Sequence, residues 1–396
     1  MSTHGRAATG GAFSDVGLAL GALALGRGAG REISFLVPRE TPVDLWRPWA
    51  RSERGSASGH GVVFEASEAR LREASERGAQ VAQALLDAAM AREAPRSRVR
   101  LMGIVNVTPD SFSDGGRFLA VEAAVAHGRA LVAAGADVLD IGGESTRPGA
   151  APVALAEELQ RVLPVIEALA RDTGTRLSID TTKAAVARAA VAAGAALVND
   201  VSAGEADPDM LATVAALGVE FVAMHRQGTP PEMQRDPRYG DPVLDVATHL
   251  RRRARAALDA GIPLSRITLD PGIGFGKRLP HNLALLARAL ELRSLGLPLL
   301  FGPSRKSFIA HVLDADDRQG DDRRGDDRRG DDRRGDDRPG AGLSALRQGS
   351  EDRIGGTAAA VTAAVLAGAD VVRVHDVRVM YEVTRVAEAI AQTEAP

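Results

Sequence analysis

One unit recurs along most of this chain, and it restricts the folds that the sequence can adopt. An alanine-rich helix ends in glycine, and a short apolar run then finishes on a polar residue. Three copies are nearly identical, and they cover Ala134–Asp140, Ala193–Asn199 and Ala367–Arg373. Glycine in the left-handed conformation ends many helices, and an uninterrupted apolar run is typical of a strand buried on both faces of a parallel sheet. The repeat therefore predicts helices that alternate with parallel strands.

Eight such strands are predicted. They begin near Arg100, Asp137, Arg176, Ala196, Glu220, Ile267, Pro298 and Val371. Helices are expected between them over residues 119–133, 155–171, 184–192, 209–216, 243–260 and 282–293, with a last helix split around an insertion. Eight regular strand–helix units predict an α/β fold, the (β/α)8 TIM barrel. A doubly wound open sheet is the alternative, and the lack of a topological break disfavours it.

Residues 1–98 lack this pattern and are predicted to form an N-terminal extension or small subdomain, whereas residues 99–396 form the barrel. Strands are expected near residues 32–36 and 62–64, with one long helix over residues 66–92.

Two segments are expected to be poorly ordered. Residues 1–30 are rich in glycine and alanine, and their apolar run Val16–Leu25 is too short for a membrane span and is disfavoured as a signal peptide. Residues 314–342 contain five pentads of the Asp-Asp-Arg-X-Gly type, in which opposite charges nearly cancel and nothing apolar can be buried. We expect deletion of these pentads to leave activity intact.

Composition excludes several classes of protein. The net charge of −3 gives no electrostatic case for a nucleic-acid or membrane partner. The chain has no cysteine, which excludes disulfides, thiolate metal sites and cysteine nucleophiles. The absence of cysteine also suits a cytoplasmic protein.

Polar side chains follow almost every predicted strand. Active sites of such barrels lie at the carboxyl ends of the strands, and here those ends carry Asn106, Asp140, Asp180, Asn199, His225, Asp270, Ser304, Arg305, Lys306, Arg373 and His375. Carboxylates and amides suit a flat, nitrogen-rich heterocycle, whereas the cationic residues suit phosphate oxygens. A lone histidine such as His225 is more often a hydrogen-bonded structural residue than a ligand.

Three loops complete the predicted site. Asp270 is followed by a glycine-rich loop that carries one aromatic residue, Phe275, in a chain with only 3% aromatics. The first strand leads into residues 106–116 and the second into residues 142–149, and both loops are polar and rich in glycine, serine and proline. Such loops often cover the mouth of a barrel.

Five motifs in this order give the chain a close resemblance to the dihydropteroate synthase family of the folate pathway. They are Asn-Val-Thr-Pro-Asp-Ser-Phe-Ser-Asp-Gly-Gly, Gly-Glu-Ser-Thr-Arg-Pro-Gly, Asp-Pro-Gly-X-Gly-Phe-Gly-Lys, Ser-Arg-Lys-Ser and Arg-Val-His-Asp. The resemblance runs from Val99 to about Val386, apart from the insert. It implies a transferase that condenses a dihydropterin methyl diphosphate with 4-aminobenzoate and releases pyrophosphate.

The resemblance also implies a role for individual residues. Asp180, Asn199, Asp270 and Lys306 are expected to hold the pterin, and Arg373 and His375 the diphosphate. Asn106 matches the Mg²⁺-binding position, and Thr146 and Arg147 match the second mobile loop. The residues that match the aminobenzoate side are Phe112, Pro148, Phe275 and Ser304. Among all of these, Lys306, Arg147, Asp180 and Asp270 are the expected catalytic residues, and the family implies a homodimer.

Two other functions remain open from the sequence alone. One is a methyltransferase that uses methyltetrahydrofolate, which shares the barrel and the acidic residues but has no need for a diphosphate grip. The other is a non-catalytic pterin-binding protein, for which loss of Asn106, Arg147 or Lys306 would be the evidence, and all three are present.

Overall fold

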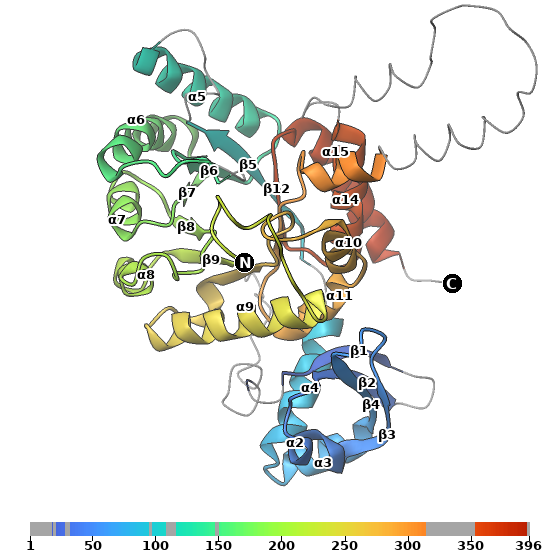
Figure 1. Cartoon of the computed structure of the whole chain (residues 1–396). Helices are drawn as coiled ribbons and strands as arrows, with labels where there is room; N and C mark the ends of the chain where they lie inside the picture. Colours follow the sequence, from blue (N-terminus) through green and yellow to red (C-terminus); the bar gives the residue numbers. More distant parts are fainter. Residues whose placement is uncertain are drawn as a thin grey trace, which may run out of the picture.

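The computed structural model describes residues 18, 21–27, 32–94, 97–107, 116–146, 150–313 and 353–393, and only the backbone of residues 116–119. The predicted insert at 314–342 lies outside these ranges. A barrel of parallel strands and helices occupies one part of the molecule, and a smaller unit of strands and helices from residues 21–93 packs against its side (Figure 1).

Eight parallel strands form the barrel, as the repeat predicts. They are β5 (Arg100–Asn106), β6 (Val138–Gly142), β7 (Arg176–Asp180), β8 (Leu197–Asp200), β9 (Glu220–Met224), β10 (Ile267–Asp270), β11 (Leu300–Phe301) and β12 (Val371–Val374). The sheet runs in the order β10-β9-β8-β7-β6-β5-β12-β11. A single bridge between Leu269 and Leu299 joins its two ends and closes the cylinder. The TIM barrel is therefore confirmed, and the open-sheet alternative is wrong.

Helices surround the strands. They are α5 (Gly116–Ala133), α6 (Leu155–Thr173), α7 (Ala184–Ala192), α8 (Met210–Leu217), α9 (Pro242–Asp259), α10 (Leu279–Ala287), α11 (Ala289–Leu292), α14 (Ile354–Leu366) and α15 (Val377–Gln392), with one-turn helices η4 (Leu264–Arg266) and η5 (Arg293–Leu295). The helix predicted over residues 282–293 is two helices, because Arg288 leaves the helical conformation and its guanidinium binds Asp241 and Glu291.

The glycines of the repeat act as expected. Gly135, Gly194 and Gly368 have φ angles of 102°, 121° and 89°, which a side chain would strain, and each lies between a helix and the next strand. The strands that follow are buried along nearly their whole length. The core of the barrel therefore holds polar side chains at fixed positions along short, rigid strands.

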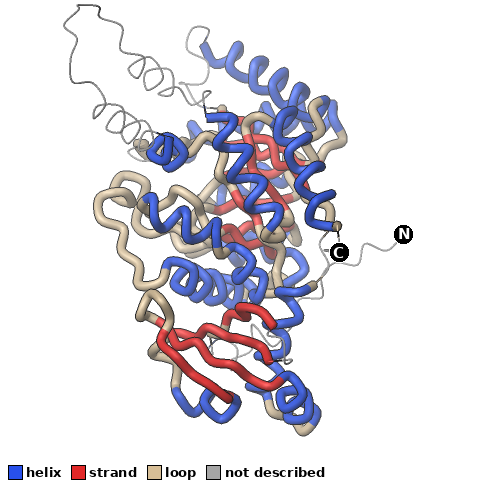
Figure 2. The backbone as a smooth tube through the Cα atoms, turned by 90° about the vertical axis from the view of Figure 1, so that its right-hand side faces the viewer, coloured by secondary structure: helices blue, strands red, loops and turns tan. Residues whose placement is uncertain are grey.

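The N-terminal unit contains a four-stranded antiparallel sheet with helices on one face (Figure 2). Its elements are β1 (Leu23–Arg27), β2 (Glu32–Pro38), α2 (Val43–Trp46), η2 (Arg47–Trp49), β3 (Ala50–Gly55), β4 (Gly61–Ser67), α3 (Glu68–Glu76) and α4 (Gln80–Glu93). Phe64 stacks on both Phe35 and Trp46 with ring centroids 5.4 Å apart, and these rings form the centre of a second apolar core.

Three features of this unit differ from the sequence expectations. The helix predicted over residues 66–92 is two helices, because Gly78 takes a φ of 85° between α3 and α4. Strand β1 lies in a segment that was expected to be poorly ordered. Strand β3 is an exposed, charged edge strand, so it lacks the alternation that reveals a strand in sequence.

Buried polar contacts fasten the N-terminal unit to the barrel. The guanidinium of Arg293 is buried and donates hydrogen bonds to the carbonyl oxygens of Arg92 at 3.0 Å, Gly368 at 3.2 Å and Ala94. At the other end of the contact, Ser58 Oγ donates to Asp241 Oδ2 at 3.1 Å, beside the start of α9. In the part of the chain that the structure describes, no helix combines the length and apolarity needed to cross a membrane.

Candidate active site

The polar residues predicted at strand ends meet at the carboxyl end of the barrel. Strands β6, β7, β8, β10 and β12 supply Asp140, Asp180, Asn199, Asp270 and Arg373, respectively. The first four residues are buried from solvent, and Arg373 is half-buried. The short parallel strands fix their positions, because neighbouring strands share one register around the barrel.

Arg373 joins the acidic residues of this group. Its Nε donates to Asp140 Oδ2 at 2.6 Å, and its Nη2 donates to Asp180 Oδ2 at 2.7 Å. Asn199 Nδ2 donates to the same Asp140 oxygen at 2.9 Å. The other carboxylate oxygens, Asp140 Oδ1 and Asp180 Oδ1, are buried and have no hydrogen-bond partner among the described residues. Such groups are rare in proteins and suit the binding of a ligand.

Burial shifts the protonation of this cluster toward neutral forms. It raises the pKa of Asp180 to about 7, against the opposing effect of Arg373. It also raises the pKa of Asp270 and lowers the pKa of Lys306 to about 7, although each of these two groups favours the charged form of the other. Acids and bases with shifted pKa values that lie close together are a mark of functional sites.

The glycine-rich loop after β10 brings Lys306 and Phe275 together. Lys306 Nζ lies 3.8 Å from the centroid of the Phe275 ring and donates to the carbonyl oxygen of Ile273. Gly274 has a φ of 82°, and a Cβ there would lie 2.7 Å from Lys306 Cδ. Asp270 Oδ1 accepts a hydrogen bond from the Gly272 amide at 2.7 Å. Glycine is therefore required where the lysine stem crosses the loop.

The segment after β11 places Ser304 beside His375. Ser304 Oγ and His375 Nδ1 are 3.0 Å apart, and the His375 amide donates to the same hydroxyl at 3.2 Å. Arg305 has an unusual φ of 57°, and its guanidinium binds both oxygens of Asp376. Arg305 therefore anchors the segment to the loop after β12, although its positive charge suggested a contact with phosphate oxygens.

The remaining predicted residues lie around the same end of the barrel or outside the described residues. Asn106 ends β5, and Thr146 lies half-buried in the loop after β6. Phe112, Arg147 and Pro148 lie outside the described residues. Within the described ranges no group of three or more His, Asp or Glu side chains could hold a metal ion.

Two features of the site were not given a role from the sequence. Asp140 was recognised as a strand-end acid, but its link to both Arg373 and Asn199 depends on which strands face one another. Lys183 binds Glu144 and the buried Glu158, and so ties the loop after β6 to the end of β7. His225 was interpreted as structural, and its ring nitrogen Nδ1 is indeed hydrogen-bonded, to Lys277.

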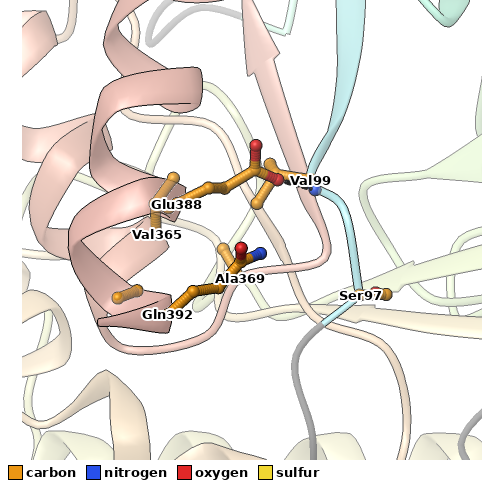
Figure 3. Close-up of a pocket in the computed structure, with 7 residues that line it drawn as sticks. Ser97, Val99, Val365, Ala369, Glu388 and Gln392 are labelled. Carbon is orange, nitrogen blue, oxygen red and sulfur yellow. Dashed lines mark hydrogen bonds between the residues drawn. The ribbon is translucent and has the colours of Figure 1, made fainter. Parts of the chain in front are cut away.

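A small pocket also lies at the opposite end of the barrel (Figure 3). Its lining residues come from the segment before β5 and from α14 and α15: Ser97, Val99, Val365, Ala369, Glu388, Ala391 and Gln392. The Glu388 carboxylate accepts a hydrogen bond from the Val99 amide. The walls are otherwise mostly apolar, so this pocket lacks the clustered acids and bases found at the carboxyl ends of the strands.

Comparison with known proteins gives a consistent result. A family model described as pterin binding enzyme matches residues 102–375. Dihydropteroate synthases from Synechocystis and Escherichia coli are 41% and 40% identical to this chain, each over 74% of this chain and 90% and 92% of theirs. The solved structure of Xanthomonas albilineans dihydropteroate synthase with 4-aminobenzoic acid superimposes with a TM-score of 0.64 at 44% identity, covering 75% of this chain and 95% of that one.

Proposed function

The chain belongs to the dihydropteroate synthase family of pterin-binding enzymes, and from this membership we propose how its residues carry out the reaction. It is a transferase of folate biosynthesis that condenses (7,8-dihydropterin-6-yl)methyl diphosphate with 4-aminobenzoate to give 7,8-dihydropteroate and pyrophosphate. The gathering of Asp180, Asn199, Asp270 and Lys306 at one end of the barrel is the observation that carries our assignment of the site.

We propose that these four residues hold the pterin ring. Asp270 accepts hydrogen bonds from the amino-pyrimidine edge, and Lys306 contacts the opposite side of the ring system. The unpartnered oxygen of Asp180 supports this assignment, because a buried acceptor without a partner costs free energy until a ligand donates to it. Because its pKa is about 7, Asp180 can accept a hydrogen bond from the ring as a carboxylate or donate one as a protonated carboxyl.

Arg373 and His375 are assigned to the diphosphate. Nε and Nη2 of Arg373 already face carboxylates, so Nη1 is the nitrogen left to meet a phosphate oxygen. Ser304 Oγ, 3.0 Å from His375 Nδ1, orients the imidazole toward the same region. Phe275, Ser304, Phe112 and Pro148 are assigned to the aminobenzoate side, and Thr146 and Arg147 to the loop that covers the reacting groups.

Asn106 is the residue assigned to Mg²⁺. Mg²⁺ keeps several waters and is usually held by one or two protein oxygens together with substrate phosphates, so a single amide at the end of β5 fits such an ion. Bound there, Mg²⁺ would neutralise charge on the leaving group.

The reaction requires one bond to break and one to form. The bond from the exocyclic methylene carbon to the diphosphate oxygen breaks, and the electron pair leaves with pyrophosphate. The aminobenzoate nitrogen forms the new bond to that carbon and then loses a proton. The pterin ring supports positive charge on the carbon, so the residues act by orientation and by charge stabilisation, with no nucleophilic side chain.

We also propose a cytoplasmic homodimer in which α14 and α15 meet their counterparts. Support comes from a stripe of exposed apolar residues on one face of α15, which consists of Val379, Val386 and Ile390. Surfaces of this kind mark association sites. Light scattering on the chain and on a Val386→Asp, Ile390→Asp variant tests the proposal, which requires a dimer that becomes a monomer.

The activity is tested by incubation with the dihydropterin diphosphate, 4-aminobenzoate and Mg²⁺, with pyrophosphate as the readout. Asp270→Asn should weaken pterin binding by roughly 2–3 kcal/mol, since a buried acceptor becomes a mismatched amide. Lys306→Ala should reduce turnover severely. Glu388→Gln, at the opposite end of the barrel, is the control and should match the unaltered chain. Unchanged pterin affinity in Asp270→Asn would reject the proposed pterin site.

A further inference from the structure

The use of lysine in this chain is restricted to three positions. Of its 49 basic residues Lys and Arg, only Lys183, Lys277 and Lys306 are lysines. All three follow barrel strands at the carboxyl end. An ammonium is a compact point charge, whereas guanidinium is a wide planar fork, so the two do not replace each other in a closed space. Lys306 is used in the proposed function, but Lys277 has no role there.

Lys277 lies in a closed space with three acceptors around its ammonium. The residue is 3% exposed. Its Nζ is 2.9 Å from His225 Nδ1, 3.0 Å from the Phe275 carbonyl oxygen and 3.4 Å from the His225 carbonyl oxygen. Three acceptors match the three hydrogens of an ammonium. Burial lowers the pKa of Lys277 well below its ordinary value, whereas the Asp270 carboxylate favours the charged form. Burial lowers the pKa of His225 well below its ordinary value, which leaves a neutral imidazole whose Nδ1 can accept a hydrogen bond.

These contacts join two segments that are far apart in the sequence. His225 follows β9, whereas Phe275 belongs to the glycine-rich loop after β10. The two segments are pressed together, because a Cβ at Gly272 would lie 1.9 Å from the His225 carbonyl oxygen and one at Gly276 would lie 2.3 Å from that of Gln227. Lys277 therefore donates hydrogen bonds to carbonyl oxygens of both segments where they pack closely together.

The loop that Lys277 holds makes direct contact with Lys306. Its Phe275 ring covers Lys306 Nζ at 3.8 Å, and its Ile273 carbonyl accepts a hydrogen bond from the same nitrogen. The other ionisable groups that face Lys306 are Asp270, Arg373 and Asp180. A shift of the loop would change the solvation and the direction of the Lys306 ammonium.

We propose that Lys277 is a positioning residue for the synthase reaction: it clamps the glycine-rich loop to the end of β9, and so holds Phe275 and Ile273 against Lys306. The proposal rests on the proposed function, which gives Lys306 to the pterin and Phe275 to the aminobenzoate. Arginine should not replace it, because a wide planar guanidinium does not match three acceptors that lie within 3.4 Å of the Lys277 Nζ.

Kinetics of Lys277→Met and Lys277→Arg provide the first test, with Arg278→Met as the matched control. Arg278 is the adjacent cation, but it is exposed and binds Asp236 at the surface. Both Lys277 variants should raise the KM for 4-aminobenzoate roughly tenfold or more, with a smaller fall in kcat. The control should keep both constants. Unchanged KM values in Lys277→Met, or an equal effect in Arg278→Met, would overturn the proposal.

Amine acetylation followed by mass spectrometry provides a readout that does not depend on turnover, because only three lysines have to be resolved. In the unaltered chain Lys277 should be the slowest of the three to react with acetic anhydride. In Lys277→Met the pKa of Lys306, measured from the pH dependence of its acetylation, should rise, since burial lowers this pKa and Lys306 gains solvent when the loop is released. A Lys277 as reactive as Lys183 rejects the clamp, even if Lys277→Met fails to fold. Absence of turnover in the unaltered chain would instead reject the proposed function and leave the acetylation test intact.

Discussion

Both ends of the barrel contain arginines and buried aspartates, but they differ in how completely the aspartate carboxylates are paired. At the amino end, Arg293 donates to three carbonyl oxygens, and the Asp370 carboxylate accepts from the Leu299 amide at 2.9 Å and from Ser97 Oγ at 3.1 Å. At the carboxyl end, Asp140 and Asp180 each keep one buried oxygen without a partner among the described residues.

This difference separates groups that stabilise the fold from groups that await a ligand. When all buried polar groups of a network are hydrogen-bonded, the hydrogen bonds offset the free energy of desolvation. When some groups lack partners, part of that free energy stays uncompensated until a ligand binds. The shifted pKa values follow the same division, because burial moves the pKa of Asp180 and that of Lys306 toward neutrality at the carboxyl end. Residue type alone would not distinguish Arg293 from Arg373.

The largest effect on activity is expected from Asp180→Asn. The amide keeps the shape of the side chain but loses the charge that faces Arg373, so turnover should fall roughly a hundredfold or more. The free energy of unfolding should stay level or rise, because a poorly solvated carboxylate is removed. Steady-state kinetics and urea unfolding measure the two quantities. A variant that loses stability but keeps its turnover would contradict the comparison.

Arg293→Met is the counterpart at the amino end. Loss of the guanidinium leaves one buried and two partly buried carbonyl oxygens without this donor, which should lower the free energy of unfolding by about 3 kcal/mol. The turnover per folded molecule should remain that of the unaltered chain, because the substitution lies at the end opposite the site. Urea unfolding and active-site-normalised kinetics check this. If turnover fell as much as in Asp180→Asn, the two ends would not be functionally distinct.

The free energy of unfolding should also depend on pH, because Asp180 and Lys306 at the carboxyl end of the barrel have shifted pKa values. The pKa of Asp180 is raised from 3.8 to about 7, so between these values the folded chain binds more protons and stability falls as pH rises. The pKa of Lys306 is lowered from 10.5 to about 7, so above pH 7 the unfolded chain binds more protons and stability rises with pH. The contribution of the site is therefore least favourable near neutral pH.

Urea unfolding over a pH series can separate these two contributions. Asp180→Asn should flatten the acidic side of the profile, and Lys306→Met should flatten the alkaline side. Arg293→Met should lower the whole profile without changing its shape. Profiles that keep both slopes in the two site variants would show that other groups are responsible.

The smallest effect is expected from Ser58→Ala, where the N-terminal unit meets the start of α9. Asp241 also accepts hydrogen bonds from the amides of Val243 and Leu244 and binds Arg288, so it remains well paired without the serine. The free energy of unfolding should fall by less than about 1 kcal/mol. Thermal unfolding measures this change, and a larger loss would mean that the loop between β3 and β4 contributes more than a peripheral contact.

The sequence predicted the barrel well because its strands are buried on both faces and end on polar residues. The start of every barrel strand lies within two residues of its expected position, since glycine and apolar runs report local conformation. Strand β3 was not predicted, because its exposed, charged residues resemble a loop. The break at Gly78 was also missed, because helical spacing continues on both sides of that glycine.

The sequence could not predict the contacts in the site between residues that are far apart along the chain. The strand-end acids could be identified from the sequence, but the pairing of Arg373 with Asp140 joins residues 233 positions apart. The contact of Lys277 with His225 spans 52 positions. Pairings of this kind depend on the curvature and register of the closed sheet, which no local pattern encodes.

The closure of the cylinder has a consequence for how the enzyme can open. Strand β11 has only two residues, and β10 reaches the segment before it through the Leu269 amide and the Pro298 carbonyl oxygen, 2.9 Å apart. Asp270 stands on one side of this seam, and the chain that carries Lys306 leaves from the other. The contact between strands with the fewest hydrogen bonds therefore separates Asp270 from Lys306. Among the barrel strands, deuterium should enter the backbone there first, and a pterin bound to both Asp270 and Lys306, as we propose, should slow this exchange.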